Sequence, residues 1–465
     1  MDLQEIFDSR KLTENGDLSY TTTGNKYLDI LFLSEFFRKN LDVLPEIETT
    51  DYDKIFSMFI RDPRFGVGER EIGRKLMKTS NCSIEETLLA GRADDLCKLI
   101  GTGELTKEEV AILEFLKKEI EAGNELVKKW MPRYSSKDLM LARKIAKCWG
   151  MNKQAYGHFI KLDNTVESRL SRKDYDSIEF SKLPSLALLK YTDSFKRNIS
   201  ERFDDFVEKL RSGEVKANVS TSTPYDIYKL AQKDDDKSGE AEALFNQLEK
   251  ISGSWLPIID TSGSMCDTND SLGKAVSIGH YLSKCSTYMP NYVVPFSSQP
   301  NLIKLGEERE GCNKRTRLST RLGSFKRYPK FSNYWNEIKS IYTGDCSSTN
   351  LGAVMEYLLD LDADKTPEFL IVLSDMEFNE GSSCSKDKLM KSWRKGARVN
   401  TKIVWWNFNS RSNTVPELDS YGNIFISGYN PRLLKFLEAG FDGEKFLEKL
   451  IEGYKEEIAK QLKNE

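Results

Sequence analysis

Hydrophobic and polar positions in the first half of the chain follow the spacing of amphipathic helices. The clearest helix begins at Thr106, because Thr106-Lys-Glu-Glu109 is a capping box and apolar residues then recur on one helical face until Pro132. Further helices are predicted at 28–37, 52–60, 69–78, 135–149, 182–197 and 203–211. No strict repeat period joins these segments, so the pattern predicts helix pairs rather than a regular solenoid.

The pattern changes near residue 253 to apolar strands that alternate with helices. Strands are predicted at 255–260, 292–296, 302–305, 368–374, 401–408 and 424–426. Helices are predicted at about 271–288, 350–361 and 386–395, with a last one from about 442. Alternation of this kind is typical of a doubly wound, mostly parallel sheet, so the predicted fold class is α + α/β.

The two patterns predict a division of the chain into an α-helical, repeat-like domain, 1–235, and an α/β domain, 253–465. The residues between them, 236–252, are interpreted as a connection. The charged and turn-rich run 233–239 suits a position on the surface. A basic insertion at 306–330 interrupts the α/β pattern.

Polar side chains stand where two of the predicted strands end. Asp260-Thr-Ser-Gly-Ser264 follows one apolar run, and Asp375 ends another. Because strand ends at one edge of a parallel sheet come together, these segments are expected to meet. Oxygen ligands alone select a hard cation such as Mg²⁺, which keeps a coordination position for an outside ligand. A polar turn and helix N-cap is the simpler interpretation of Asp-Thr-Ser-Gly-Ser taken alone.

A third polar segment, the Gly/Ser/Thr-rich turn at 343–352, lies between these two in the sequence. It opens a predicted helix, and Thr349 is best placed to offer a hydroxyl to the cation. Ser347 or Ser348 could take its place. The three pieces occur in the order that a cation site built from separate loops requires.

Together the three segments resemble the metal-ion-dependent adhesion site (MIDAS) of von Willebrand factor type A (vWA) domains. That family's motif, D-x-S-x-S followed by a Thr and then an Asp, carries over onto Asp260, Ser262, Ser264, Thr349 and Asp375. The resemblance implies that Asp260, the two serines and Thr349 contact the ion directly or through water, and that Asp375 usually does so through water. It also implies that an Asp or Glu of a protein partner completes the coordination shell.

Composition narrows the chemistry available to the protein. Its 465 residues carry 69 basic and 72 acidic side chains, a formal net charge of −3, so no global field draws it to nucleic acid or membrane. A catalytic triad or a histidine zinc site would have to use His158 or His280, the two histidines of the sequence. We interpret both as packing or surface residues. No catalytic residue is therefore predicted.

The cysteines and the N-terminus predict a cytoplasmic protein. Eight cysteines are scattered without a C-x-x-C pair, which argues against a zinc ribbon, a redox pair or a dense disulfide scaffold. The first residues are acidic rather than typical of a signal peptide, and no apolar stretch approaches about 18 residues. We expect an intracellular setting, a virion included, without membrane insertion.

One basic segment, 128–161, contains a single acid, Asp138, and five interleaved aromatic residues. Its candidate RNA-binding residues are Lys128, Lys129, Arg133, Lys137, Arg143, Lys144, Lys147 and Lys153. The aromatic residues are Trp130, Tyr134, Trp149, Tyr156 and Phe159. Cations that neutralise phosphates beside rings that stack on bases favour single-stranded RNA. The alternative is a solvated helix face above aromatic core residues.

Two further basic runs are less informative. The insertion contributes Lys314, Arg315, Arg317, Arg321, Lys326 and Arg327, which could hold phosphate or an acidic protein or keep the domain soluble. In the run 61–75, Gly66 and Gly68 predict a turn before a helix that could present backbone donors to an anion. No G-K-[ST] follows, so a P-loop is not predicted.

Helices followed by a vWA domain also resemble the arrangement of the TROVE family, the Ro-type RNA-binding proteins. A closer resemblance is to an uncharacterised intracellular family of plants, fungi and large viruses, which joins a TROVE-like part to a vWA domain. It rests on four motifs: R-D-x-R-x-G-x-G-E-R at 61–70, K-W-x-P-R at 129–133, P-S at 184–185 and L-S-D-M-E-F at 373–378. The resemblance implies a curved or closed helical array that binds RNA with basic residues.

These observations lead to one preferred hypothesis and two alternatives. The preferred one is a non-enzymatic, ribonucleoprotein-type binding protein that uses Mg²⁺ in the vWA domain and RNA contacts in the helical domain. The first alternative is an assembly or virion component whose metal binds a partner's carboxylate without RNA. The second is a metal-dependent phosphoryl hydrolase that uses Asp260, Asp375 and Glu377.

Overall fold

The computed structural model divides the chain into two compact units that differ from the predicted domains. The first unit comprises Met1–Pro45 and Phe180–Glu452, and the second comprises Glu46–Glu179 and Gly453–Glu465. The structure describes residues 10–13, 18–135, 137–162, 165–219, 222–236, 239–306, 333–342, 346–359, 366–379, 401–409, 414–416, 423–428 and 443–464. The boundary expected near residue 235 thus lies inside the first unit, where helices on both sides of it pack together.

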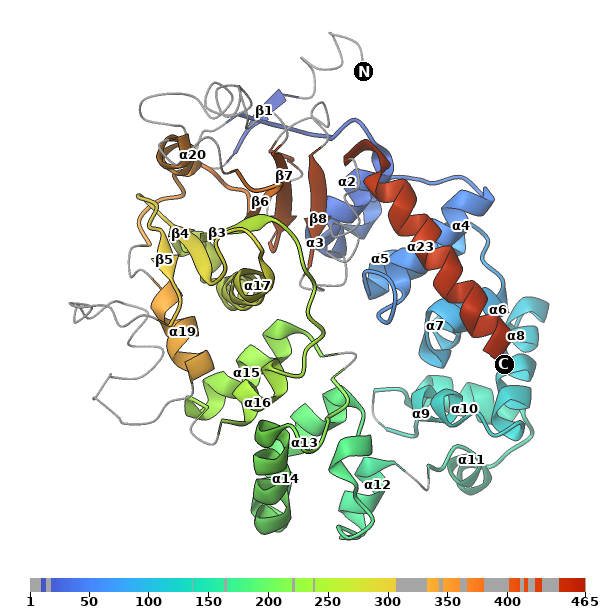
Figure 1. Ribbon diagram of the computed structural model, residues 1–465. Coiled ribbons are helices and arrows are strands. Elements are labelled where there is room, and N and C mark those ends of the chain that lie inside the picture. The colour runs from blue at the N-terminus through green and yellow to red at the C-terminus, as the bar shows by residue number, and fades with distance from the viewer. Residues whose placement is uncertain are drawn as a thin grey trace. The chain divides into compact units, whose positions relative to one another are not determined.

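A six-stranded sheet forms the centre of the first unit (Figure 1). Its strands, in spatial order, are β5 (Ile303–Lys304), β4 (Tyr292–Phe296), β3 (Trp255–Asp260), β6 (Phe369–Ser374), β7 (Lys402–Asn407) and β8 (Ile424–Ser427). All neighbours pair in parallel except β4 and β5. The predicted mostly parallel sheet is confirmed, and the continuous apolar runs of β3 and β6 are buried on both faces, as such strands require.

The strand order reverses beside β3. The chain moves from β3 outward through β4 to β5, and then returns to β6 on the other side of β3. The connections therefore leave the carboxyl ends of β3 and β6 in opposite directions, which opens a crevice there. Asp260 is the last residue of β3, and Asp375 directly follows β6.

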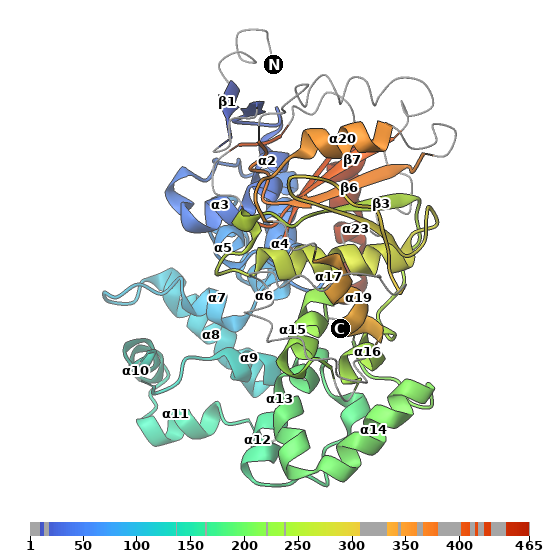
Figure 2. The ribbon, with the colours of Figure 1, turned by 90° about the vertical axis from the view of Figure 1, so that its left-hand side faces the viewer.

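Helices cover both faces of this sheet. Helix α17 (Ser271–Cys285) lies on one face and α20 (Leu351–Leu359) on the other (Figures 1 and 2). The Trp255 indole of β3 donates to the Leu282 carbonyl of α17 over 2.8 Å. Gly279 permits this close approach, because a Cβ there would come within 2.4 Å of the Ile259 side chain. Helix α19 (Asn333–Ile341) was not predicted, and the predicted helix at 386–395 lies outside the described residues.

The N-terminal helices belong to the sheet unit rather than to the helical one. They are α2 (Lys26–Phe32) and α3 (Ser34–Lys39), which follow a short hairpin of β1 (Arg10–Leu12) and β2 (Leu18–Tyr20). Phe32 packs edge-on against Phe425 of β8, with ring centroids 5.5 Å apart. The Ser427 hydroxyl donates to the Leu31 carbonyl over 2.7 Å. The apolar face of α2 thus covers the edge strand β8, a tertiary contact that local spacing cannot predict.

The described residues of the expected surface connection at 233–239 are partly buried instead. Asp236 is 2% exposed, and its carboxylate accepts the backbone N–H groups of Ala241 and Glu242 at the start of the next helix. The Asp235 carboxylate accepts the Trp335 indole N–H from α19. The charged, turn-rich run suits a surface connection by its sequence, but these two carboxylates accept hydrogen bonds from donors that packing removes from water. The helices of this region are α13 (Ser185–Asn198), α14 (Ser200–Ser212), α15 (Pro224–Asp234) and α16 (Glu240–Phe245).

The second unit is helical, as the sequence predicts. Its helices are α4 (Asp51–Arg61), α5 (Arg70–Thr79), α6 (Ile84–Ala90), α7 (Ala93–Cys97), α8 (Lys107–Glu121), α9 (Glu125–Trp130), α10 (Leu139–Cys148), α11 (Lys153–Phe159) and α12 (Val166–Ser171). The capping box of Thr106 and Glu109 is confirmed. The helix ends before the expected stop at Pro132, because Gly123 adopts a φ of +93° and Asn124 caps a new helix. The last helix, α23 (Gly443–Asn464), crosses the boundary between the units in sequence.

The glycine-rich motif at 61–70 builds a buried ion-pair cluster in this unit. Arg61 and Asp95 are both about 2% exposed and form an ion pair, and Arg74 donates to the other Asp95 oxygen over 2.8 Å. Gly66 is required for close packing, because a Cβ would lie 1.9 Å from the Phe59 carbonyl oxygen. The predicted turn before α5 is present. Arg61 and Arg70, at the two ends of the motif, form ion pairs with Asp95 and Asp94 of the same unit. No helix among the described segments is long and apolar enough to cross a membrane.

Substituting Asp95 with Asn is expected to destabilise the second unit by about 3–5 kcal/mol, because Arg61 would keep its buried charge without a full counter-charge. Burial raises the pKa of Asp95, but Arg61 and Arg74 outweigh burial and hold the pKa below its ordinary value. The ion pairs therefore stabilise the fold above the ordinary Asp pKa, and this contribution disappears as the pH falls through the lowered value.

Urea unfolding of the wild type and of Asp95→Asn between neutral and acid pH would measure the effect. The difference in unfolding free energy should shrink toward low pH. Glu125→Gln, which removes an exposed pair with Lys128, is the control and should change stability by at most about 1 kcal/mol. Equal stability of Asp95→Asn and this control would contradict the assigned role.

Candidate metal centre

The first predicted ligand, Asp260, is a buried carboxylate without a cationic partner. It is fully buried, one oxygen accepts the Ser262 N–H over 2.9 Å, and the other accepts the Ser374 hydroxyl over 2.5 Å. Burial raises the pKa of Asp260 to about 6, and the hydrogen bonds only partly offset this effect. Among the described residues no Lys, Arg or His forms an ion pair with it. A divalent cation would supply the missing positive charge.

Three loops meet at the reversal of strand order, and we call them the site loops: 260–264 after β3, 346–350 before α20, and 375–379 after β6. Gly263 donates its N–H to the Cys346 carbonyl over 3.1 Å, which joins the first loop to the second. The second and third loops are joined by a reciprocal pair of hydrogen bonds between Thr349 and Asn379. Ser374, the last residue of β6, links the third loop to the first because its hydroxyl donates to the Asp260 carboxylate. The three predicted segments are therefore held together directly.

The hydroxyl groups of the predicted set differ in exposure. Ser262 and Thr349 are each 2% exposed, and the Ser262 and Ser264 hydroxyl oxygens lie 3.0 Å apart. Ser348 is anchored through its backbone, since its N–H donates to the Ser297 hydroxyl, which in turn donates to the Ser348 carbonyl. Ser347 is exposed. Burial beside the other site loops favours Thr349 over both serines as the hydroxyl ligand.

The third site loop has an unusual backbone. Asp375 is 1% exposed, and one of its oxygens accepts the Glu377 N–H over 3.4 Å. Between these residues Met376 adopts a φ of +67°, the left-handed region that favours glycine. Such a conformation costs about 1–3 kcal/mol and is maintained only where surrounding contacts impose it. Here Met376 is 4% exposed and donates its N–H to the Ser374 hydroxyl, so packing and hydrogen bonding impose the turn.

The donor set fits a hard cation. No cluster of three or more His, Cys, Asp or Glu side chains suited to a metal occurs in the part of the chain that the structure describes. The predicted set instead combines the two carboxylates with the hydroxyls of Ser262, Ser264 and Thr349. Carboxylate and hydroxyl oxygens suit Mg²⁺, which would also tolerate bound water in the remaining positions.

The basic segment 128–161 falls into two groups in the second unit. Lys128 and Lys144 pair with acidic residues, Glu125 and Glu109, and Lys144 also donates to the Gly101 carbonyl. The exposed group is Lys129, Arg133, Lys137, Arg143 and Lys147, and none of these forms an ion pair with another described residue. Lys153 is also exposed and lies 5.8 Å from the Tyr134 ring centroid. The exposed group can neutralise an external anion, whereas Lys128 and Lys144 are already engaged.

The aromatic residues of this segment mainly form the core. Trp149 is 9% exposed and donates to the Leu113 carbonyl, and Tyr156 is fully buried and donates to the Pro132 carbonyl. Their interpretation as base-stacking platforms is wrong, because both rings and both polar groups are used within the hydrophobic core of α7 to α11. The alternative, a basic face above an aromatic core, describes these two residues.

One half-buried cation that sequence reasoning did not single out lies beside this segment's Trp130. Arg92 is half-buried and stacks on Trp130, with its guanidinium carbon 4.1 Å from the ring centroid. Burial lowers the pKa of Arg92, and the nearby charges of Arg61 and Arg70 lower it further. No carboxylate forms an ion pair with Arg92 among the described residues. The only sequence signal was a lone arginine distant from the basic segment, since the contact with Trp130 is made by folding.

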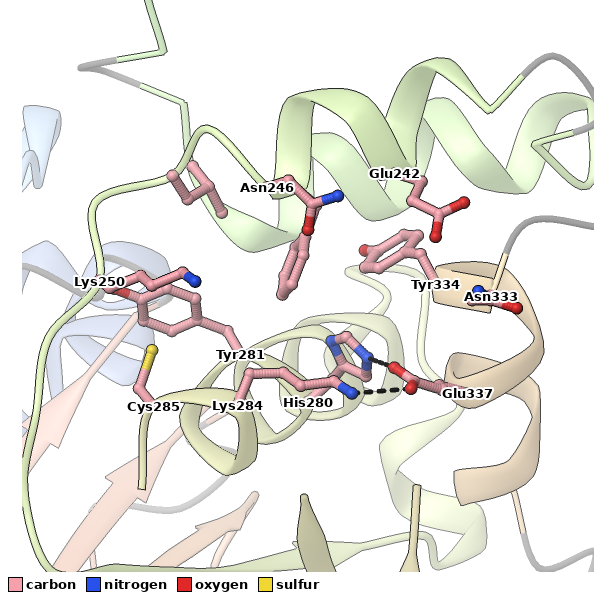
Figure 3. Close-up of a pocket in the computed structure, with 12 residues that line it drawn as sticks. Glu242, Asn246, Lys250, His280, Tyr281, Lys284, Cys285, Asn333, Tyr334 and Glu337 are labelled. Atoms are coloured by element: carbon pink, nitrogen blue, oxygen red, sulfur yellow. Dashed lines mark hydrogen bonds and ion pairs between the residues drawn. The ribbon is translucent and has the colours of Figure 1, made fainter. Parts of the chain in front are cut away.

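The remaining residues singled out in the sequence are the two histidines and the basic residues of the insertion. His158 is exposed, whereas His280 is fully buried on α17 and bonds to Glu337 over 2.7 Å at the wall of a pocket (Figure 3). The interpretation of both as surface or packing residues agrees with these positions. The basic insertion residues Lys314, Arg315, Arg317, Arg321, Lys326 and Arg327 lie outside the described residues.

Three comparisons place the chain among known proteins. A family model described as a domain of unknown function, DUF2828, matches residues 150–261. The chain is 24% identical to the uncharacterized protein L728 of Acanthamoeba polyphaga mimivirus, over 91% of this chain and 83% of that protein. It also resembles the crystal structure of the Deinococcus radiodurans Ro (RSR) protein, with a TM-score of 0.39 and 12% identity, over 92% of this chain and 96% of that chain. The viral relative agrees with the resemblance to a family found in large viruses, and the vWA resemblance stays a prediction.

If the site loops bind Mg²⁺, the ion should stabilise the folded protein by about 2.7 kcal/mol at a hundredfold excess over its Kd. Asp260→Asn keeps the shape of the side chain but removes its charge, so this variant should fold in chelator and lose the Mg²⁺-dependent rise in Tm. Thermal unfolding with Mg²⁺ and with EDTA measures both effects. Asp42→Asn makes the same change at an exposed carboxylate and serves as the control. This variant should keep the full Mg²⁺-dependent rise in Tm. A response that survives in Asp260→Asn would place the ion elsewhere.

Proposed function

We propose that this protein is a non-enzymatic binding protein that captures an acidic group of a protein partner through Mg²⁺. The direct hydrogen bonding of the three site loops carries this proposal. It supports a single site to which Asp260, Thr349 and Asp375 contribute. These ligands bring two negative charges, so a bound Mg²⁺ accepts a further oxygen ligand without excess charge. A partner's carboxylate supplies that ligand.

RNA is the second proposed partner, and the second unit is proposed to bind it. The exposed, unneutralised group of Lys129, Arg133, Lys137, Arg143 and Lys147 supports this. On α10, Arg143 and Lys147 are four residues apart and share a face, and Met140, 76% exposed, precedes Arg143 by one turn. Cations beside an exposed apolar side chain suit a nucleic-acid backbone with unpaired bases. The stack of Arg92 on Trp130 adds a guanidinium that can meet a phosphate.

A ribonucleoprotein-type role follows if both proposals hold. The metal would link the protein to a partner chain, and the basic face would hold the RNA. Loss of RNA binding alone would favour the assembly or virion alternative, in which the metal site acts without RNA. Metal-dependent release of phosphate would favour the hydrolase alternative, in which Asp260, Asp375 and Glu377 act on a phosphoryl group.

Partner capture is tested by purifying tagged protein from cells in Mg²⁺ or in EDTA and identifying what co-purifies. Wild-type protein in Mg²⁺ should retain a protein partner, which EDTA and Asp260→Asn should both release. Asp42→Asn should behave as wild type. A partner retained equally by Asp260→Asn would show that the site loops do not hold it.

RNA binding is tested by titrating a fluorescent single-stranded RNA at several salt concentrations. The double variant Arg143→Glu/Lys147→Glu should weaken binding at least tenfold and flatten the dependence of log K on log salt, because fewer counterions are released. Lys107→Glu/Lys118→Glu is the matched control, since it makes the same charge change at exposed positions of α8 in the same unit. Equal weakening in both double variants would indicate only a general charge effect.

A further inference from the structure

The N-terminal hairpin of β1 and β2 contacts the third site loop. Thr13, which directly follows β1, is 6% exposed, and its hydroxyl donates to the Phe378 carbonyl over 2.7 Å. Phe378 lies 365 positions later in the chain. It is fully buried and packs against Trp405 of β7, with ring centroids 6.0 Å apart. The contact therefore connects the start of the chain to the loop that carries Asp375.

The peptide group between Phe378 and Asn379 is held at both ends. Its carbonyl accepts from Thr13, and its N–H, which belongs to Asn379, donates to the Thr349 carbonyl over 2.9 Å. The Asn379 side chain accepts the Thr349 N–H in return, over 3.0 Å. A peptide group is planar and stiff, so a hydrogen bond at one end also orients the other end. Thr13 is thus linked to Thr349, the predicted hydroxyl ligand, through one rigid group.

Burial makes this link sensitive to the loss of a single hydroxyl. Thr13, Phe378 and Thr349 are all buried, and hydrogen bonds in series strengthen one another where the local dielectric constant is low. The desolvation of a buried carbonyl is offset only by the hydrogen bonds that it accepts. Removing the Thr13 donor therefore disfavours the present orientation of the Phe378–Asn379 peptide. The third site loop would be held less firmly against the second.

The hairpin has little stability of its own. It consists of three residue pairs, and an isolated two-stranded hairpin is at best marginally stable in water. A further anchor is a reciprocal pair of backbone hydrogen bonds between Tyr20 and Val415, over 2.9 and 2.7 Å. Segments of low local stability open at a lower free energy than the whole fold. Docking of the hairpin is therefore an equilibrium that a ligand at the site loops can shift.

We propose that docking of the N-terminal hairpin sets the affinity of the site loops for Mg²⁺, with Thr13 as the positioning residue. This role depends on the Mg²⁺ site of the proposed function and adds a means of regulating it. Thr13 is not a ligand of the ion, but it aligns the peptide that joins the third site loop to Thr349. Because coupling between two equilibria is reciprocal, bound Mg²⁺ also holds the hairpin in place. Detachment of the hairpin would release the ion.

Thr13→Val tests the positioning role, because valine keeps the shape of the side chain and removes the hydroxyl. Calorimetric titration of the full chain with Mg²⁺ should give a Kd about three- to tenfold higher than that of the wild type, as expected for one lost hydrogen bond. Thr13→Ser keeps the hydroxyl and should restore a Kd close to that of the wild type. Rescue by serine separates the hydrogen bond from the packing of the side chain.

Thr401→Val is the matched control for this titration. Thr401 is also buried in the first unit, and its hydroxyl donates to the Pro367 carbonyl over 2.8 Å. This bond lies where β6 and β7 begin, at the edge of the sheet opposite to the site loops. Thr401→Val should lower the Tm in EDTA and leave the Kd for Mg²⁺ unchanged.

Two failures of this titration have different meanings. A Kd that rises equally in both valine variants, or in neither, would overturn the positioning role of Thr13 and leave the metal site standing. A wild type that binds no Mg²⁺ would instead remove the proposed metal site, and the role of the hairpin with it.

Hydrogen exchange on the wild type tests the coupling in the other direction and needs no hairpin variant. Saturating Mg²⁺ should slow exchange at the Tyr20 and Val415 amides by about the factor found for the Kd, because both amides bond across the docked hairpin. Asp260→Asn should show no such gain in protection. An equal gain at amides throughout the first unit would indicate only general stabilisation and would contradict a specific coupling between hairpin and metal.

Discussion

The reversal of strand order between β3 and β6 is the constraint on which the candidate metal centre depends. Parallel strands need long connections, and two connections that leave adjacent strand ends in opposite directions cannot fill the space between them. The chain ends β3 with Asp260 and follows β6 with Asp375, so both residues lie at that edge of the sheet. The loop before α20 then supplies Thr349 through its hydrogen bonds to Asn379.

Two buried carboxylates show how the protein handles negative charge in its two units. Asp95 is surrounded by arginines and is held ionised, so it acts as the centre of a structural ion-pair cluster. Asp260 is equally buried but has only N–H and O–H donors around it, and its pKa is raised. The charge of Asp95 is compensated within the fold, whereas the charge of Asp260 is the one that the proposed cation would compensate.

The cations of the second unit divide in the same way. Arg61 and Lys144 form ion pairs with carboxylates of the protein itself, and Arg143 and Lys147 form none with the described residues. Basic residues that are close in sequence therefore have different uses. Exposure and the absence of a described ion-pair partner, rather than charge density, mark the surface proposed for RNA.

The sequence by itself determined the local elements and the polar strand ends. Apolar runs of five or six residues define β3 and β6, helical spacing defines α8 and α17, and the Asp-x-Ser-x-Ser string marks the first site loop. These features depend on neighbours within a few residues, so pattern is sufficient to find them. Only the tertiary structure decided which aromatic rings are core, that α2 covers β8, that Arg92 meets Trp130, and that His280 lies against Glu337. Each of these contacts joins residues tens to hundreds of positions apart, and burial, which sets their chemistry, is a property of the packed chain rather than of any local segment.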